Sequence, residues 1–131
     1  MNDLQRLLAC EEIRQLAYRY ALAIDSRDID SLVGLFVEDV RVGRDRSGRE
    51  ALRDDFEKQL GAVGITILFV GNHIIEFDDD DHARGIVYCR GETQDGDRWI
   101  TQAIQYRDTY ERRDGRWYFV RRKHLLWYGA E

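Results

Sequence analysis

The sequence predicts an α+β fold, in which N-terminal helices pack against one long, curved antiparallel sheet. Apolar residues recur at helical spacing in three segments of the first half, residues 3–25, 28–36 and about 48–60. The second half contains β-branched apolar runs separated by the turn signals Asp95–Gly96 and Asp114–Gly115. Helices followed by a meander of strands are typical of this fold class.

Each predicted helix has a recognisable start. Asn2 or Asp3 can cap the first helix, and Asp28 can cap the second. Ser47 and Glu50 have the spacing of a capping box for the third. Asp25 ends the first helix, where an acid opposes the helix dipole. We therefore expect something other than helix stability to hold Asp25 in place.

We expect a brief strand at residues 39–43, before the third helix, and the long strands after that helix. The central strand, residues 65–77, is apolar on both faces, and strict alternation predicts that one face carries Ile65, Ile67, Phe69, Gly71, His73, Ile75 and Phe77. After a polar turn at residues 78–82, we expect three more strands near residues 83–93, 98–111 and 116–128. Several of these strands are apolar on both faces, which favours a homo-oligomer in which a second subunit covers the outer face.

Length, charge and cysteine content limit the classes of function. At 131 residues, with no linker or repeat, we expect a single domain, residues 1–131. The net charge of −5, without a large basic cluster, argues against a nucleic-acid partner. No N-terminal apolar run is long enough for a signal peptide or a membrane span. Cys10 and Cys89 lie far apart, which favours reduced thiols in a cytoplasmic protein.

His73 is the first candidate for chemistry, because it is the one titratable side chain in its predicted apolar row. An imidazole titrates near neutral pH and acts as a general base when a partner fixes its tautomer. Asp25 is the expected partner. The alternative is that His73 is a structural core histidine and that Asp25 caps the following turn.

Three further residues are candidates for the same pocket. Tyr20 lies on the buried stripe of the first helix, as a core aromatic or as a hydroxyl donor to a substrate oxygen. Arg122 lies in a largely apolar row of the last strand, where it needs an anion or acceptor unless it is exposed at the sheet edge. His124 shares that row, in the pocket or at its rim. No local motif supports a metal held by Asp25, His73 and His124, and we expect neither a metal nor a cofactor.

The whole chain resembles the SnoaL-like members of the nuclear transport factor 2-like superfamily in helix order, in the long meander and in the segment Tyr110–Phe119, YERRDGRWYF. It is most similar to a branch that holds scytalone dehydratase, hexachlorocyclohexane dehydrochlorinase and bile acid 7α-dehydratase. Asp25 and His73 stand where that branch has its paired Asp and His. Tyr20 and Arg122 stand where bile acid dehydratase has a Tyr and an Arg. The dehydrochlorinase has Lys at the position of Tyr20, a departure that favours an oxygen leaving group here.

The resemblance implies a cone-shaped, cystatin-like α+β barrel, no cofactor and often a homotrimer. It also implies catalytic roles for His73, Asp25, Tyr20 and Arg122. With the residue analysis it predicts a dehydratase, in which His73 removes a carbon-bound proton and water is eliminated from a small, apolar, ring-containing substrate. The expected pocket lining is Ile65, Phe69, Tyr88, Ile104, Tyr106, His124, Leu126 and Trp127. Isomerisation, polyketide cyclisation and a non-catalytic binding or assembly module remain as alternatives.

Overall fold

The computed structural model describes residues 1–130 and confirms the α+β class. The three helices are α1 (Asp3–Ser26), α2 (Ile29–Gly34) and α3 (Arg49–Gly61). The long strands are β3 (Thr66–Phe77), β4 (His82–Asp95), β5 (Arg98–Arg113) and β6 (Arg116–Ala130). A small hairpin of β1 (Arg41–Val42) and β2 (Arg46–Ser47) precedes α3, and its second strand was not predicted.

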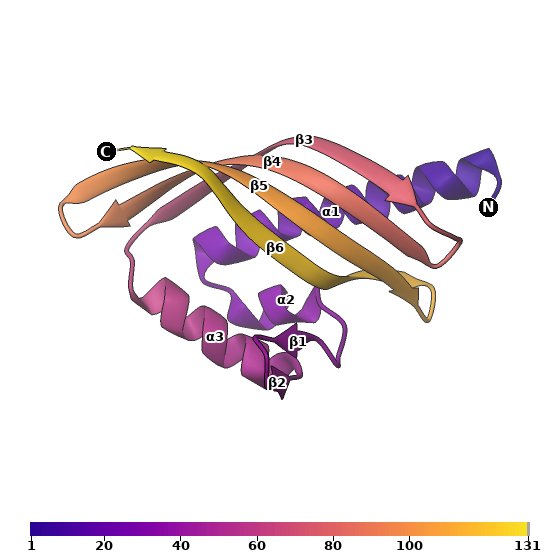
Figure 1. The fold of residues 1–131 in the computed structure, drawn as a ribbon, viewed down its shortest axis with the longest axis horizontal. Helices are drawn as coiled ribbons and strands as arrows, with labels where there is room; N and C mark the ends of the chain where they lie inside the picture. The colour runs from indigo at the N-terminus through magenta and orange to yellow at the C-terminus, as the bar shows by residue number, and fades with distance from the viewer. Residues whose placement is uncertain (131) are drawn as a thin grey trace.

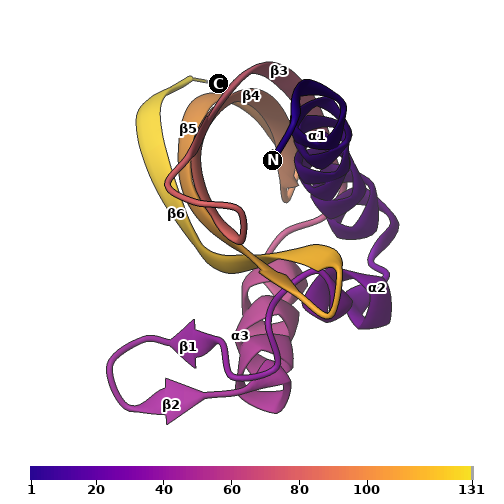
Figure 2. The ribbon, with the colours of Figure 1, turned by 90° about the vertical axis from the view of Figure 1, so that its right-hand side faces the viewer.

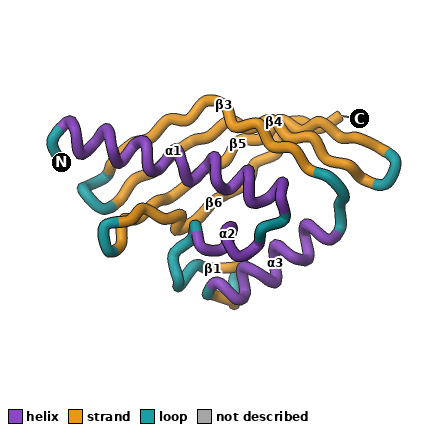
Figure 3. Tube along the Cα trace, turned by 180° about the vertical axis from the view of Figure 1, so that it is seen from behind, coloured by secondary structure: helices purple, strands orange, loops and turns teal. Residues whose placement is uncertain are grey.

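The main sheet is antiparallel, with the strand order β3-β4-β5-β6 (Figure 1). It curves strongly but does not close, so that β3 and β6 remain its edges (Figure 2). Helix α1 lies along the concave face, while α2 and α3 pack together at one end (Figure 3). The concave face is therefore the interior of the domain, and the convex face is turned away from the helices.

Local sequence signals account for most element boundaries. The Asn2 side chain accepts a hydrogen bond from the Gln5 backbone N–H, and the Gln5 side chain accepts one from the Asn2 N–H, which together form a capping box. Asp28 caps α2 as predicted. The capping box expected at Ser47 is wrong, because Ser47 pairs in β2 and Gly48 occupies the cap position without a side-chain hydrogen bond.

A β-bulge in β3 overturns the predicted strand face. Val70 pairs with Cys89 but His73 pairs with Val87, so β3 has one residue more than β4 across this interval. Before the bulge, even-numbered residues face the helices, and after it odd-numbered residues do, as their burial shows. His73 therefore shares the interior face with Thr66, Leu68 and Val70, whereas Ile65, Ile67 and Phe69 point outward.

The core lies between the sheet and the helices. Its largest fully buried side chains are Trp117, Tyr110, Phe119, Ile13, Leu32 and Val87. Within residues 1–130, no helix combines the length and the hydropathy that a membrane span requires. The concave face of the sheet, which α1 covers, also carries buried polar side chains, and these are the candidates for a functional site.

Candidate functional site

Two adjacent rows of cross-strand pairs on the concave face bring the polar residues together. In one row, His73 on β3, Val87 on β4, Tyr106 on β5 and His124 on β6 follow one another across the sheet. In the next row, Gly85, Asp108 and Arg122 are paired in the same way. Residues far apart in the chain thus meet because antiparallel pairing places opposite side chains on the same face.

Arg122 and Asp108 form a buried ion pair. The Nε of Arg122 donates to Oδ1 of Asp108 over 3.0 Å, and the two side chains are 3% and 0% exposed. Burial raises the pKa of Asp108 above its ordinary value, while the charge of Arg122 opposes that rise. Asp108 is thus the acceptor that an arginine in an apolar row requires, and the sequence analysis missed it. The signal was an acid among alternating apolar residues of the strand that precedes Arg122.

Three aromatic rings surround the guanidinium of Arg122. Its Cζ lies 3.7 Å from the ring centre of Tyr106, 4.4 Å from that of Tyr20 and 4.9 Å from that of Phe119. Rings at these distances stabilise a cation through their electron-rich faces. Nη1 and Nη2 are buried and have no hydrogen-bond partner. A desolvated guanidinium with two unused donor nitrogens is suited to bind an oxygen atom of a ligand.

Tyr20 lies beside Arg122. Its ring contacts Tyr106 and Phe119 at centroid distances of 5.7 Å and 5.9 Å. Burial raises the pKa of its hydroxyl, so the phenol is neutral and can donate a hydrogen bond. The structure therefore brings Tyr20 and Arg122 together.

His73 belongs to the same hydrogen-bond chain through Tyr110. The Nε2 of His73 lies 2.9 Å from the Tyr110 hydroxyl oxygen, and that hydroxyl donates to Oδ2 of Asp108 over 2.7 Å. Burial and the positive charges of Arg122 and Arg14 lower the pKa of His73 to about 4. The imidazole is therefore neutral at pH 7. Its Nδ1 is buried and has no hydrogen-bond partner.

The expected hydrogen bond between Asp25 and His73 is not formed. Asp25 accepts hydrogen bonds from the Thr66 hydroxyl over 3.0 Å and from the Leu68 backbone N–H over 2.9 Å. Leu68 pairs with Gly91 and His73 with Val87, and these partners are four residues apart in β4, which is about 13 Å at roughly 3.3 Å per residue. Because β3 is an edge strand, its outward N–H groups need an acceptor, and Asp25 supplies one. Asp25 thus fastens the end of α1 to the sheet.

The expected lining residues divide between the two faces of the sheet. Ile104, Tyr106, His124 and Leu126 lie on the concave face, in cross-strand pairs with one another. Phe69, Tyr88 and Trp127 lie on the opposite face of the sheet and are 59%, 42% and 53% exposed, and Leu126 is also 52% exposed. Tyr88 alternates with buried Val87 and Cys89, and its ring packs edge-on against Trp127 with centroids 4.9 Å apart. These exposed aromatic residues belong to the convex face.

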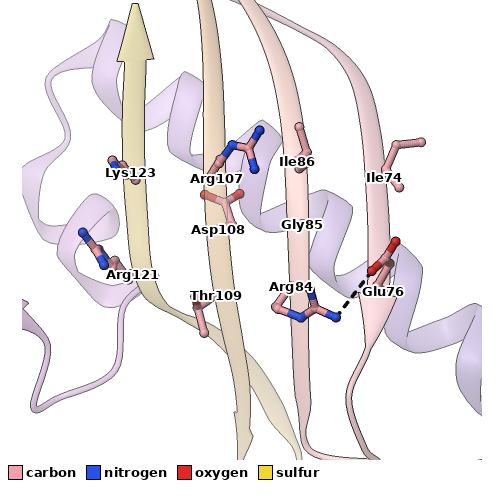
Figure 4. A pocket seen from close by; sticks show the side chains of 10 residues that line it. All are labelled: Ile74, Glu76, Arg84, Gly85, Ile86, Arg107, Asp108, Thr109, Arg121 and Lys123. Carbon is pink, nitrogen blue, oxygen red and sulfur yellow. Dashed lines mark hydrogen bonds and ion pairs between the residues drawn. The ribbon is translucent and has the colours of Figure 1, made fainter.

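The convex face also carries a shallow hollow of about 290 Å³ (Figure 4). Its apolar part comes from Ile74 and Ile86, and its basic part from Arg107, Arg121 and Lys123. The hollow is separated by the sheet from the unused nitrogen atoms of Arg122 and His73. Gly85 and Asp108 are the two lining residues of the hollow that also take part in the interior rows.

Neither metal ligands nor a reactive thiol complete the interior site. Among residues 1–130, no group of three or more His, Cys, Asp or Glu side chains is arranged to hold a metal ion. Both cysteines are free. Burial raises the pKa of the Cys89 thiol to about 11, so it is not a nucleophilic thiolate at neutral pH. The titratable groups of the interior site other than Arg122 are thus His73, His124, Asp108 and the tyrosines.

Comparisons with known proteins agree with this architecture. The sequence pattern of the SnoaL-like domain matches residues 5–123. The gamma-hexachlorocyclohexane dehydrochlorinase of Sphingobium indicum is 29% identical over 130 residues, which cover 93% of this chain and 83% of that protein. The crystal structure of LinA superposes with a TM-score of 0.88 at 27% identity, and 99% of this chain and 93% of that chain are covered. The LinA-type3 dehydrochlorinase of Novosphingobium barchaimii gives 0.87 at 25% identity, with 98% and 93% covered.

Proposed function

This chain belongs to the SnoaL-like domain family, and we propose that it is a cofactor-independent lyase that eliminates water from a small, apolar, ring-containing substrate. The observation that carries the proposal is the set of three buried nitrogens without partners, Nδ1 of His73 and Nη1 and Nη2 of Arg122. Buried polar atoms are almost always hydrogen-bonded in folded proteins. A bound substrate would supply the missing partners. The dehydrochlorinases among the relatives are named for an elimination reaction, which supports the same reaction class.

In the proposed reaction, neutral His73 removes a proton from a carbon atom next to a carbonyl group. The electron pair of that C–H bond moves into an enolate, whose oxygen accepts hydrogen bonds from Arg122. Donors fixed in a desolvated site can lower such a barrier by several kcal/mol. The enolate then reforms the carbonyl as the β C–O bond breaks, and the imidazolium of His73 protonates the departing hydroxide. Water and a conjugated double bond result, and His73 is neutral again.

The charge of the site favours a neutral substrate with a polar oxygen. Asp108 already balances the charge of Arg122, and His73 is uncharged. A carboxylate ligand would therefore bring an uncompensated negative charge into a desolvated site, whereas a carbonyl oxygen would not. Ile104 and the ring of Tyr106 provide apolar contacts beside it.

A substrate screen tests this proposal. Purified protein is incubated with hydroxylated cyclic ketones and, for comparison, with chlorinated cyclohexanes, and the formation of the double bond is followed by ultraviolet absorbance. We expect water loss from a hydroxy ketone, and proton transfer by a positioned base implies that His73→Ala lowers the rate by about 10²–10⁴-fold. His82→Ala is the matched control, since His82 is an exposed imidazole at the first residue of β4. Undiminished activity in His73→Ala would remove His73 from the mechanism.

A non-catalytic ligand-binding module is the second candidate, and the placement of Asp25 favours it. Asp25 binds the Thr66 hydroxyl and the Leu68 backbone N–H, so its carboxylate is bonded to groups other than the imidazole of a base. In that case hydroxy ketones would bind without being converted. Isothermal titration of the wild type and of Arg122→Met with hydroxy ketones, together with an assay for product, decides between the two. The binding module is favoured if the wild type binds the ketone saturably, the variant does not bind it, and no product forms.

We also propose that the convex sheet face mediates homo-oligomerisation. Phe69, Ile74 and Trp127 are each more than half exposed on this face. Large exposed apolar patches are typical of protein interfaces. Phe69→Asp should shift the mass measured by light scattering from an oligomer to a monomer. Leu22→Asp, at an exposed leucine of α1, should leave the mass unchanged. A wild type that is monomeric at micromolar concentration would contradict the proposal.

A further inference from the structure

We propose that Tyr110 and Asp108 are positioning residues that hold His73 in a single tautomer, with the proton on Nε2 and the lone pair on Nδ1. This inference rests on the proposed function in that it takes His73 as the base. It adds two residues that the sequence analysis did not identify, and it states which nitrogen of the imidazole receives the substrate proton.

The direction of each hydrogen bond follows from counting hydrogens along the chain. Arg122 can only donate, and it donates to Oδ1 of Asp108. A carboxylate can only accept, so Oδ2 of Asp108 takes the hydrogen of the Tyr110 hydroxyl over 2.7 Å. That hydroxyl has no second hydrogen, and its oxygen must therefore accept from Nε2 of His73 over 2.9 Å. A neutral imidazole carries one N–H, which leaves Nδ1 with the lone pair.

The opposite direction requires a protonated Asp108. In that arrangement Asp108 would donate to Tyr110, Tyr110 would donate to Nε2, and the proton of His73 would lie on Nδ1. The buried guanidinium of Arg122, bonded to the same carboxyl group, favours the ionised form of Asp108. A protonated Nδ1 would also be a buried donor without an acceptor, which is costly.

The absence of a side chain at Gly85 independently supports this position of the Tyr110 ring. A Cβ at residue 85 would lie 2.5 Å from the Tyr110 hydroxyl oxygen and 2.8 Å from a ring carbon. Gly85 is the cross-strand neighbour of Asp108, and Tyr110 is completely buried. The tyrosine ring therefore lies directly on the β4 backbone, in space that any other residue would fill. This contact holds the hydroxyl between the carboxylate and the imidazole.

The arrangement explains how the imidazole of His73 is oriented although no carboxylate contacts it directly. A neutral phenol separates the negative charge of Asp108 from His73. The imidazole therefore gains orientation from the pair, while its proton affinity stays low because of the nearby charges of Arg122 and Arg14. The lone pair on Nδ1 has no protein partner. It lies on the other ring nitrogen from the one that Tyr110 binds.

Nitrogen NMR of the histidine rings tests the inference directly. The protein is labelled with ¹⁵N-histidine, and long-range proton–nitrogen correlations at pH 7 report which ring nitrogen carries hydrogen. The signals of His73 are assigned by their loss in His73→Gln. We expect a protonated Nε2 and an unprotonated Nδ1 in the wild type, and averaged signals from two tautomers in Tyr110→Phe. Tyr18→Phe, at an exposed tyrosine of α1, should leave the His73 signals unchanged.

Each outcome is informative, including failure of a variant to fold, because the wild-type spectrum by itself tests the tautomer. Hydrogen on Nδ1 in the wild type, or an unchanged tautomer in folded Tyr110→Phe, would overturn the inference. If the tautomer is as expected but the wild type converts no hydroxy ketone, the positioning pair stands and the proposed function fails. If His73→Ala is inactive but the wild-type tautomer is mixed, the function stands and the positioning pair fails.

Discussion

Replacing Arg122 with Met tests the buried ion pair on which the site is built. The Arg122–Asp108 bond is 3.0 Å long between side chains that are 3% and 0% exposed. The Arg46–Asp54 pair has a similar length, 2.9 Å, but its side chains are 54% and 59% exposed. Removing one partner of a buried pair leaves the other charge desolvated and costs about 3–5 kcal/mol. Exposed pairs contribute about 0–1 kcal/mol.

We therefore expect Arg122→Met to lower the free energy of unfolding by about 3–5 kcal/mol at pH 7. The matched control Arg46→Met should lower it by less than about 1 kcal/mol. Urea denaturation followed by tryptophan fluorescence is suitable, because Trp117 is only 2% exposed and reports on the core. Similar losses in the two variants would refute the claim that burial, and not merely contact, determines the strength of this pair.

The pH dependence of the same variant provides a second check. Without Arg122, only the hydrogen bond from Tyr110 opposes the rise in the pKa of Asp108 that burial causes. An acid whose pKa is raised in the folded state favours folding once it is protonated. Arg122→Met should therefore regain stability, relative to the wild type, as the pH falls from 7 towards 4. The double variant Arg122→Met with Asp108→Asn should show no such recovery.

Three further predictions concern His73, Asp25 and the last hairpin. The pKa of His73 is about 4, below the ordinary 6.5, so the unfolded chain takes up the proton first and stability falls as the pH drops from 6.5 to 4. His73→Gln should flatten this fall in stepped-pH denaturation, whereas His82→Gln should steepen it, because the raised pKa of His82 stabilises the fold at acid pH. Asp25→Ala should lower the free energy of unfolding by about 2–4 kcal/mol, since it removes two hydrogen bonds to a charged group and leaves the Leu68 N–H without an acceptor, yet it should not move the NMR titration of His73. Gly115→Ala should cost roughly 1 kcal/mol in thermal unfolding, because residue 115 has a φ of 78° in the turn between β5 and β6; an unchanged melting temperature would contradict this.

The elements were predictable because their signals are local. The helices follow from apolar spacing and from caps at Asn2 and Asp28. The turn at Asp114–Gly115 joins β5 and β6 as a two-residue hairpin with positive φ at both residues. Arg122 was recognised as an arginine in need of an acceptor, and Asp108 is that acceptor.

The expected partnership of Asp25 with His73 was wrong for a reason that lies outside any local pattern. The bulge at Gly71–Asn72 exchanges the two faces of β3, and the docking of α1 places Asp25 against Leu68. A Gly–Asn pair inside an apolar strand was the signal for the bulge. No local pattern in the sequence indicates where along β3 the end of α1 docks, and so none indicates how far Asp25 lies from the imidazole.

The sequence by itself determined the α+β class, the order of helices and strands and the presence of several polar residues among apolar ones. These properties depend on residues near one another in the chain, through helical periodicity, strand alternation and turn chemistry. Only the tertiary structure decided that Arg122, Asp108, Tyr110 and His73 form one hydrogen-bond chain and that Asp25 lies outside it. Cross-strand register and helix docking set those contacts, and a shift of one residue in either moves a side chain to the opposite face.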